Sequence, residues 1–431
     1  MRHVKTHHIS NPETFKKQLL NWSQQFDEVV WLDSNDYAQK HTSYDAVLAV
    51  EAFTIFQTDY FDAFNQLKEY QSSTNDWIFG YLTYDLKNDV ERLTSNNHDE
   101  LGFSDLFFFQ PKKLFFLRGN VLETHYLNFV EEELDNDLKK IKSTVTSCVV
   151  EKQENNIKIK LRIHKDEYFN KLNTMLSHIH RGDIYEANFC QEFYAEDTTI
   201  NPIETYKKLN AISKPPFATF MRVYDKYLLS ASPERYIKKE GLKITSQPIK
   251  GTAKRSTNKQ EDEALIKHLS EDIKERSENV MIVDLVRNDL SKTATKGSVT
   301  VEELCKVYTF DQVHQMISTV TSQVNASTHP VDIIKTTFPM GSMTGAPKIS
   351  AMKIIEALEE TKRGLYSGAV GYFSPDDDFD FNVVIRSILY NETNKYVSYS
   401  VGGAITAKSE PLKEYEECLV KAKAMREVLE N

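Results

Sequence analysis

The chain has 431 residues, a formal net charge of −10 and a mean hydropathy of −0.49. This length exceeds one simple hydrophobic core, so we expect two domains or one large composite unit. The acidic charge balance argues against a nucleic-acid-binding surface. No run of about 18 apolar residues could span a membrane, and no apolar segment follows the basic N-terminus as in a secretory signal. Four scattered cysteines without CxxC spacing indicate a protein of the reducing cytoplasm.

The first part of the chain mixes short strand-like runs with polar connections. These runs occupy residues 29–32, 46–50 and 114–118. A charged, exposed helix is expected over 131–142, followed by a polar loop over 151–156. We therefore place a domain boundary near residue 155, which divides residues 1–155 from residues 156–431.

The second part carries clearer helical periodicity. Tyr168, Leu172, Met175 and Ile179 share one face of a helix that ends at Gly182. Two more helices are expected, one through residues 265, 269 and 273 and one over 411–428, where the apolar stripe is Tyr415, Cys418, Leu419, Ala422 and Met425. Strand-like runs lie at 227–230, 242–245, 383–389 and 396–401. Strands and helices without strict alternation predict an α+β fold.

Several acidic residues could hold a metal ion. Glu414, Glu417 and Lys421 fall on one face of the last helix, and two carboxylates one turn apart suit Mg²⁺. A solvated helix face is the alternative for this pair. Glu278 stands at the edge of the apolar run 280–286, where a buried carboxylate needs a partner. Arg287 or a metal could be that partner, and an ordinary ion pair at the helix edge is the alternative.

Glu234 and Lys250 form a possible acid and nucleophile. Glu234 follows an apolar strand in a Ser-Pro turn, and burial would raise its pKa and make it a general acid. Lys250 stands in the segment Gln247–Thr252 after a second strand, and we expect desolvation to lower its pKa and free its amine for attack. The alternative is that each residue only caps a strand end and forms a local salt bridge.

Two glycine-containing segments could bind anions. The segment Gly341–Lys348 offers backbone N–H groups, a hydroxyl and a cation before a helix expected over 349–359. Gly402 and Gly403 offer a similar backbone site at the end of a strand. Together with Arg386 these groups suit carboxylates, although each segment alone could be a tight turn.

Taken in order, these motifs resemble one family. The matching segments are 182–188, 231–235, 248–252, 278–289, 341–348, 364–372, 385–387 and 414–417. Together they are similar to the chorismate-utilising enzymes, which include anthranilate, aminodeoxychorismate, isochorismate and salicylate synthases. The resemblance implies two layered β-sheets with helices outside, in which both parts of the chain share one core. It also implies chorismate as the substrate and Mg²⁺ as the cofactor.

The resemblance assigns roles to individual residues. Glu278 and Glu417 match metal ligands with Glu414 close by, and Glu234 matches the general acid that protonates the departing C4 hydroxyl. The residues that match substrate-holding groups are Gly251, Thr252, Thr344, Tyr366, Arg386, Gly402 and Gly403.

Lys250 separates the branches of the family. Anthranilate synthases carry alanine there, whereas lysine is typical of the first component of aminodeoxychorismate synthase. The implied reaction is stepwise: Lys250 attacks C2 as the C4 hydroxyl leaves, and ammonia from a separate glutamine amidotransferase subunit then attacks C4 and expels the lysine. The product is 4-amino-4-deoxychorismate, the precursor of 4-aminobenzoate and folate. Anthranilate synthase activity and a non-catalytic chorismate-binding subunit are the alternatives.

Three positions depart from the family pattern. Glu186 replaces the usual glutamine and adds a negative charge near an anionic substrate. Gln315 stands where a histidine is usual, and a histidine lies one residue earlier at His314. Asp33 follows Leu32 where feedback-regulated anthranilate synthases carry glutamate, which leaves regulation by tryptophan undecided.

Overall fold

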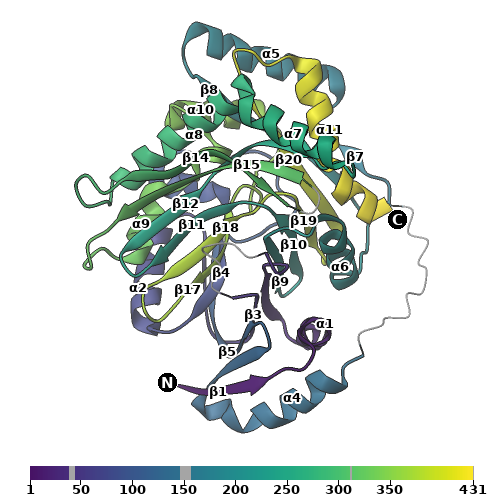
Figure 1. The fold of residues 1–431 in the computed structure, drawn as a ribbon, viewed down its shortest axis with the longest axis vertical. Helices are drawn as coiled ribbons and strands as arrows, with labels where there is room; N and C mark the ends of the chain where they lie inside the picture. Colours follow the sequence, from purple (N-terminus) through teal and green to yellow (C-terminus); the bar gives the residue numbers. More distant parts are fainter. Residues whose placement is uncertain (38–43, 146–156, 311–312, 431) are drawn as a thin grey trace.

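An antiparallel sheet of twenty strands runs through the computed structural model, which describes residues 1–37, 44–145, 157–310 and 313–430 (Figure 1). The strands within these residues are β1 (Arg2–His8), β2 (Glu28–Asp33), β3 (Ala46–Thr58), β4 (Ile78–Leu82), β5 (Leu106–Arg118), β6 (Val121–Leu127), β7 (Lys160–Leu161), β8 (Glu186–Ala195), β9 (Phe217–Val223), β10 (Lys226–Ser232), β11 (Arg235–Glu240), β12 (Lys243–Gln247), β13 (Ile249–Lys254), β14 (Thr300–Thr309), β15 (Val313–Gln323), β16 (Gly345–Ala346), β17 (Ala369–Phe373), β18 (Phe379–Val383), β19 (Ser387–Asn391) and β20 (Tyr396–Thr406). The helices are α1 (Pro12–Trp22), α2 (Ala63–Thr74), α3 (Lys87–Glu91), α4 (Leu134–Ser143), α5 (Lys165–Arg181), α6 (Pro202–Ser213), α7 (Lys259–Glu271), α8 (Ile273–Ser291), α9 (Pro330–Thr337), α10 (Lys348–Leu358) and α11 (Pro411–Glu430), with short 3-10 turns η1 (Ser23–Gln25), η2 (Tyr84–Leu86), η3 (Asn128–Glu133) and η4 (Gly341–Met343).

The sheet branches at the long strand β5 into two wings. One wing runs from β5 through β3, β2, β9, β10, β19 and β20 to β8. The other runs from β5 through β4, β17, β18, β11 and β12 to β15, which also pairs with β13 and β14. The wings form the two layers expected from the sequence, and the α+β class is confirmed.

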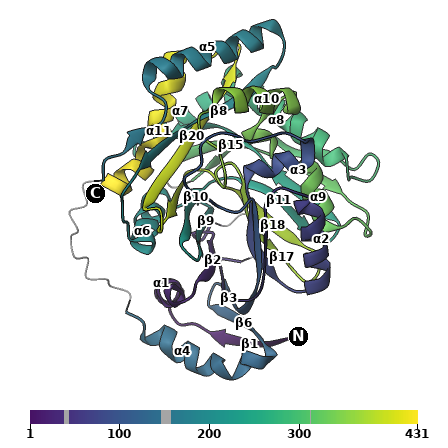
Figure 2. The same ribbon diagram turned by 180° about the vertical axis from the view of Figure 1, so that it is seen from behind.

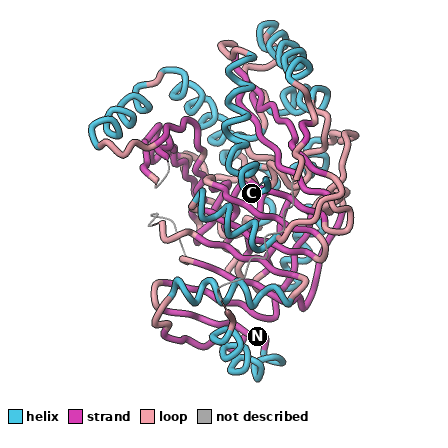
Figure 3. The backbone as a smooth tube through the Cα atoms, turned by 90° about the vertical axis from the view of Figure 1, so that its right-hand side faces the viewer, coloured by secondary structure: helices cyan, strands magenta, loops and turns pink. Residues whose placement is uncertain are grey.

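Helices cover the outside of the strand layers (Figure 3). In Figures 1 and 2, α5, α7, α8, α10 and α11 lie at one end of the molecule, while α1 and α4 lie beside β1 at the other. The last helix, α11, packs on β20, α5 and α6, and α8 packs on β13 and β15. Among the described residues, no helix is both long and apolar enough to cross a membrane.

Both parts of the chain build the same core. Strand β2 pairs with β9, and β4 pairs with β17, so segments before and after residue 155 are hydrogen-bonded neighbours. One cluster of buried side chains includes Trp31 and Phe115 from the first part together with Tyr399 and Met425 from the second. The boundary expected near residue 155 lies outside the described residues, and the division into two domains there stays a prediction.

Helical periodicity located α5 and α11 correctly. The four apolar residues of α5 are buried, and Gly182 ends the helix with φ +88°, a left-handed conformation that glycine adopts without steric cost. In α11 the expected stripe is buried at Cys418, Ala422 and Met425, but Leu419 is 37% exposed. The buried face is instead completed by Glu414 at one end and by Val428 and Leu429 at the other.

Three local expectations were wrong. The helix through residues 265–273 breaks at Asp272, whose carboxylate accepts a hydrogen bond from Glu275 N at 3.0 Å and begins α8, which leaves Ile273 76% exposed. The strand expected over 383–389 is interrupted between β18 and β19, where Arg386 has φ +53°. The helix expected over 131–142 begins as η3, and its α4 portion buries Leu138 and Ile141 instead of being exposed.

Candidate active site

Lys250 lies in β13 at a turn of the backbone that depends on glycine. The neighbouring Gly251 has φ +91°, and the register between β13 and β15 shifts at this point. The Lys250 side chain is 12% exposed, and its Nζ lies 3.6 Å from Glu186 Oε1. Burial opposes the ammonium charge, but the carboxylates of Glu186, Glu278 and Glu234 outweigh it and raise the pKa of Lys250 above its usual value. The expectation of a lowered pKa was wrong, because the site holds several acids around one amine.

Glu234 occupies the tight connection between β10 and β11. Its backbone N–H donates to Ser232 Oγ at 3.3 Å, and its carbonyl accepts from Val383 N at 3.0 Å. The residue is 4% exposed. Burial raises the pKa of Glu234 to about 7, while a hydrogen bond with Ser342 and the charge of Lys250 act in the opposite direction. A carboxyl group with this pKa is partly protonated near neutral pH and can act as a general acid.

Glu278 lies on α8 and faces the same cluster of charges. Burial raises the pKa of Glu278 to about 7 against the opposing charges of Lys250 and Lys274. Its Oε1 atom is buried without a hydrogen-bond partner. Arg287, one of the two partners considered for Glu278, donates instead to Asp284 at 2.7 Å, so that possibility was wrong. The nearest cation on the helix is Lys274, whose Nζ lies 3.8 Å from Glu278 Oε1.

The acids of α11 lie over β20 at its two glycines. Lys421 Nζ lies 2.6 Å from Glu417 Oε1 and donates to Gly402 O at 2.9 Å. A Cβ atom at Gly403 would lie 3.2 Å from Glu414 Oε2, so the backbone and this carboxylate approach closely. Gly402 and Gly403 lie inside β20 rather than at its end, because pairing with β8 continues to Thr406.

The donor chemistry of this cluster suits a hard divalent cation. Glu278, Glu414 and Glu417 supply carboxylate oxygens, and the unpartnered Glu278 Oε1 is a buried acceptor available to a cation. Lys274 Nζ also lies 3.7 Å from Glu414 Oε1, so an ammonium group stands between acids of α8 and α11. Among the described residues, no three His, Cys, Asp or Glu side chains are gathered closely enough to form a ready-made metal site.

The segment Gly341–Lys348 presents a hydroxyl but no available cation. Thr344 is 1% exposed, and its hydroxyl donates to the carbonyls of Met340 at 3.3 Å and Gly341 at 3.2 Å. Lys348 Nζ instead donates to Asp289 Oδ2 at 2.6 Å and to Pro339 O at 2.9 Å. Lys348 therefore fixes this segment to α8, and the expectation that its charge binds an anion was wrong.

The remaining predicted residues separate into two groups. Tyr366 is buried, with its hydroxyl 3.6 Å from Cys190 Sγ. Burial lowers the pKa of Arg386, whereas the charges of Tyr366 and Glu417 act in the opposite direction and indicate that these groups are neighbours. Thr252 is exposed on β13 and is not part of the buried cluster.

The structure adds residues that the sequence did not single out. Arg363 is buried and donates to the carbonyls of Met343 at 2.7 Å and Asn188 at 2.8 Å, and it also pairs with Glu359. It thereby joins the end of η4 to β8. Lys274 was missed as well. Both residues stand four positions from a glutamate, Lys274 before Glu278 and Arg363 after Glu359. This spacing is typical of an ion pair and was the signal in the sequence that could have identified them.

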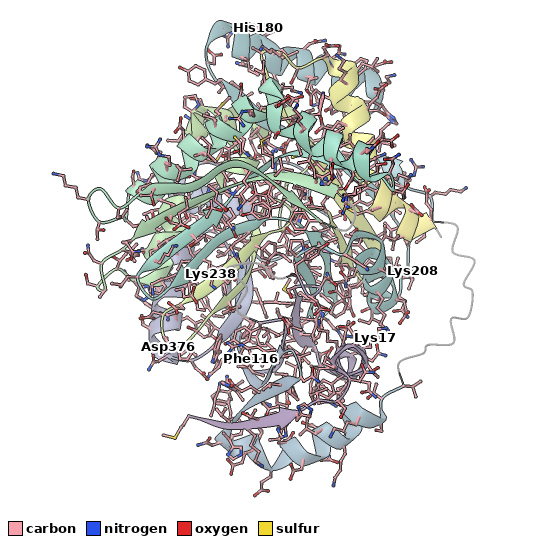
Figure 4. The ribbon with its side chains drawn as sticks, viewed as in Figure 1. Lys17, Phe116, His180, Lys208, Lys238 and Asp376 are labelled. Carbon is pink, nitrogen blue, oxygen red and sulfur yellow. The ribbon has the colours of Figure 1, made fainter. Side chains whose placement is uncertain are left out.

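Two histidines near the motif segments, His314 and His180, make their contacts away from the cluster. His314 is fully buried, with Nε2 2.9 Å from Asp262 Oδ1 of α7 and Nδ1 3.0 Å from Thr309 Oγ1. Both ring nitrogens are therefore committed to these neighbours. His180 lies at the outer end of α5, labelled at the top of Figure 4.

The fold and the buried acid–lysine cluster define a class of protein. A family model described as chorismate binding enzyme matches residues 27–427, and the chain belongs to this family. An aminodeoxychorismate synthase from Streptomyces griseus is 42% identical over 275 residues, which cover 63% of this chain and 37% of that protein. Anthranilate synthase component 1 from Thermus thermophilus is 31% identical over 359 residues, which cover 82% of this chain and 77% of that protein.

A solved structure has the same fold. Anthranilate synthase component I from Streptococcus pneumoniae TIGR4 superposes with a TM-score of 0.80 at 24% identity, covering 90% of this chain and 95% of that one. At this identity the likeness concerns the fold alone. The chain spans only 37% of the length of the Streptomyces protein, so the two differ in extent.

Proposed function

We propose that this chain aminates chorismate at C4 to form 4-amino-4-deoxychorismate, as the first component of an aminodeoxychorismate synthase. The observation that carries the proposal is Lys250, a buried amine in the same cluster as Glu234. The name of the Streptomyces relative supports it. A covalent displacement requires a nucleophile and an acid that protonates the leaving group. A buried amine can serve as the nucleophile, and a protonatable carboxyl group can serve as the acid.

The chain's own residues would act in two steps. Lys250 Nζ forms a bond to C2 of chorismate while both conjugated double bonds of the ring shift and the C4–O bond breaks. The departing hydroxyl takes a proton from Glu234 and leaves as water. Ammonia then forms a bond to C4, both double bonds shift back, and the C2–N bond to Lys250 breaks. A tethered nucleophile replaces one difficult displacement by two easier ones.

Several groups would position the substrate. Tyr366, Arg386, Thr344 and the backbone at Gly251, Gly402 and Gly403 are proposed to hold the substrate carboxylates. Glu278, Glu414 and Glu417 are the residues that would hold Mg²⁺. When bound, the ion would screen a substrate carboxylate from the surrounding acids. Thr252, which is exposed on β13, is the remaining residue proposed to contact the substrate.

Ammonia is proposed to come from a separate glutamine amidotransferase subunit. No Gly-x-Cys-x-Gly segment surrounds any of the cysteines in this chain. The Thermus relative is named as a component, which is consistent with a larger assembly for that protein.

Product identity tests the proposal directly. The purified chain is incubated with chorismate, Mg²⁺ and an ammonium salt. The products are separated by chromatography and identified by mass spectrometry. We expect 4-amino-4-deoxychorismate. Anthranilate as the dominant product would establish the second candidate, anthranilate synthase, which the long match to the Thermus relative favours. Chorismate binding without any product would identify a non-catalytic subunit.

A further inference from the structure

Glu186 is a buried carboxylate next to the proposed nucleophile, and no role has yet been given to it. It is 2% exposed, and its Oε1 lies 3.6 Å from Lys250 Nζ. Its other oxygen, Oε2, is buried without a hydrogen-bond partner. A fully buried carboxylate with a free oxygen is costly unless the site uses it, because removing it from water costs several kcal/mol.

The backbone around Glu186 is fixed from two sides. Glu186 pairs with Ala346 of β16 and with Thr406 of β20. A Cβ atom at Gly345 would lie 2.2 Å from Glu186 O, so only glycine allows this approach. Tyr185 N also donates to Ala346 O at 2.7 Å. The carboxylate is therefore held by a rigid strand and not by a mobile loop.

Lys250 requires a proton acceptor before it can attack. A protonated amine has no lone pair, and the acids around Lys250 favour its protonated form. The charged groups whose fields reach Lys250 are Glu186, Glu234, Glu275, Glu278 and Glu417. Glu234 is committed to the departing hydroxyl in the proposed reaction, and Glu278 and Glu417 are assigned to the metal. Glu186 alone forms an ion pair with Lys250 among the described residues.

We propose that Glu186 accepts a proton from the Lys250 ammonium, which frees the amine to attack C2, and returns that proton when the lysine is expelled. The inference rests on the proposed function. The separation of 3.6 Å is slightly longer than a hydrogen bond, and such distances commonly tighten when substrate binds.

The proton balance of the cycle closes with these two carboxyl groups. The cycle starts with Lys250 charged, Glu186 ionised and Glu234 protonated. Glu186 takes one proton from Lys250, the amine adds to C2, and Glu234 gives its proton to the departing hydroxyl, which leaves as water. Ammonia adds to C4 and the neutral amine of Lys250 leaves C2. The new C4 ammonium gives a proton to Glu234, and Glu186 returns its proton to Lys250. The sum is chorismate and ammonia to aminodeoxychorismate and water.

The test is the pH dependence of Glu186→Gln relative to the unmodified enzyme. In the unmodified enzyme the shared proton moves within the ion pair, so this step neither gains nor loses protons from solvent. In Glu186→Gln the ammonium must lose its proton to solvent. The quantity to follow is the kcat/KM of the variant divided by the kcat/KM of the unmodified enzyme. We expect this ratio to be well below one at pH 6. It should rise about tenfold per pH unit as long as the pH is below the pKa of Lys250. Any other group that titrates in both proteins changes both values of kcat/KM equally, so its effect cancels in the ratio.

A counter-ion role predicts the opposite. If Glu186 only stabilised the ammonium, its loss would release the free amine more easily, and the ratio would exceed one and stay constant with pH. That result would overturn the proposal. Glu186→Asp, which retains a carboxylate, should restore the flat ratio. Glu196→Gln removes the same charge from an exposed position paired with Lys160 and should match the unmodified enzyme throughout.

A second measurement separates this inference from the proposed function. The rate at which Lys250 is reductively methylated, followed by peptide mass spectrometry across pH, needs no turnover. Glu186→Gln should shift the labelling curve of Lys250 to lower pH, and an unshifted curve would contradict the ion pair itself. If the unmodified enzyme forms anthranilate, the proposed function fails and the proton-transfer role fails with it. If it forms aminodeoxychorismate and the ratio is constant, only the role of Glu186 fails.

Discussion

Lys274 and Glu278 stand one helical turn apart on α8, and Lys274 Nζ lies 3.8 Å from Glu278 Oε1. The same Nζ is 3.7 Å from Glu414 of α11, so one lysine links acids of two helices. The carboxylates of Glu278 and Glu414 would otherwise repel one another, and the positive charge between them offsets that repulsion. Lys274 thereby occupies a position where it would compete with a cation bound to these acids.

Replacement of Lys274 by methionine should strengthen binding of the metal ion. The variant removes a competing cation and keeps the length of the side chain. Because the Lys274 side chain is 43% exposed, solvent screens its charge, and we expect an increase in Mg²⁺ or Mn²⁺ affinity of only about two- to tenfold. Calorimetric titration of the free protein measures it without substrate. Lys413→Met, which removes an exposed charge from α11, is the matched control. Unchanged or weaker binding would refute a metal site at these acids.

Replacement of Lys250 by arginine should abolish amination while preserving the positive charge. A guanidinium stays protonated at every accessible pH and does not act as a nucleophile. We expect kcat to fall by about 10³-fold or more, since the reaction loses its tethered nucleophile. Chorismate affinity, measured by equilibrium binding, should change little. Amination that continued at an unchanged rate would rule out covalent catalysis, whereas a trapped adduct on Lys250 in the unmodified enzyme would support it.

Replacement of Glu234 by glutamine should slow the reaction and stabilise the protein at alkaline pH. Loss of the general acid should reduce kcat by about 10²–10⁴-fold. In the unmodified enzyme the rate should fall as pH rises through about 7, where Glu234 loses its proton.

The stability effect has a definite sign. Burial raises the pKa of Glu234 to about 7 in the folded state, so ionisation destabilises the folded protein above that pH and has no such cost below the ordinary pKa of a glutamate. The free energy of unfolding of Glu234→Gln should exceed that of the unmodified protein by up to about 3 kcal/mol at pH 8.5. The difference should shrink as pH falls toward about 4. Urea unfolding at both pH values measures it, and a difference independent of pH would contradict the assignment.

Replacement of Arg363 by methionine should damage both stability and the site. Arg363 and Glu359 form a buried ion pair, and the guanidinium also holds the carbonyls of Met343 and Asn188. Leaving Glu359 buried without its partner should lower the free energy of unfolding by about 3–5 kcal/mol. The double variant Arg363→Met, Glu359→Gln should lose less than the sum of the two single changes, because it removes both charges together. Strictly additive losses would show that the pair does not act as a unit.

Much of the site could be predicted because its residues stand in short, specific segments. Glu234 follows an apolar strand in a Ser-Pro turn, and this local pattern was enough to predict its burial and its raised pKa. Lys250 was found in the same way, but its pKa was predicted in the wrong direction. The sequence showed that the lysine would be buried, whereas it could not show that Glu186 and Glu278 would be brought beside it from β8 and α8.

Residues whose role depends on a distant partner were misjudged. Lys348 resembled an anion-binding cation in a turn, but its ammonium group pairs with Asp289 of α8. Thr252 belongs to a matching motif, and only the fold shows that it is exposed on β13, so its contact with substrate stays a prediction. Arg287 was a possible partner for Glu278, but their positions on α8 place it beside Asp284 instead.

The sequence by itself determined the family and the α+β class and pointed to Glu234 and Lys250 as the proposed acid and amine, because these depend on residue types and spacings within short segments. The tertiary structure alone decided the electrostatics. Which carboxylates surround Lys250, which cation neutralises Glu278 and Glu414, and which charges cancel in internal ion pairs all depend on strands and helices far apart in the chain. Charge interactions act over distances in space rather than in sequence, so only the fold could show that neighbouring carboxylates raise the pKa of Lys250 and that Glu186 stands beside it.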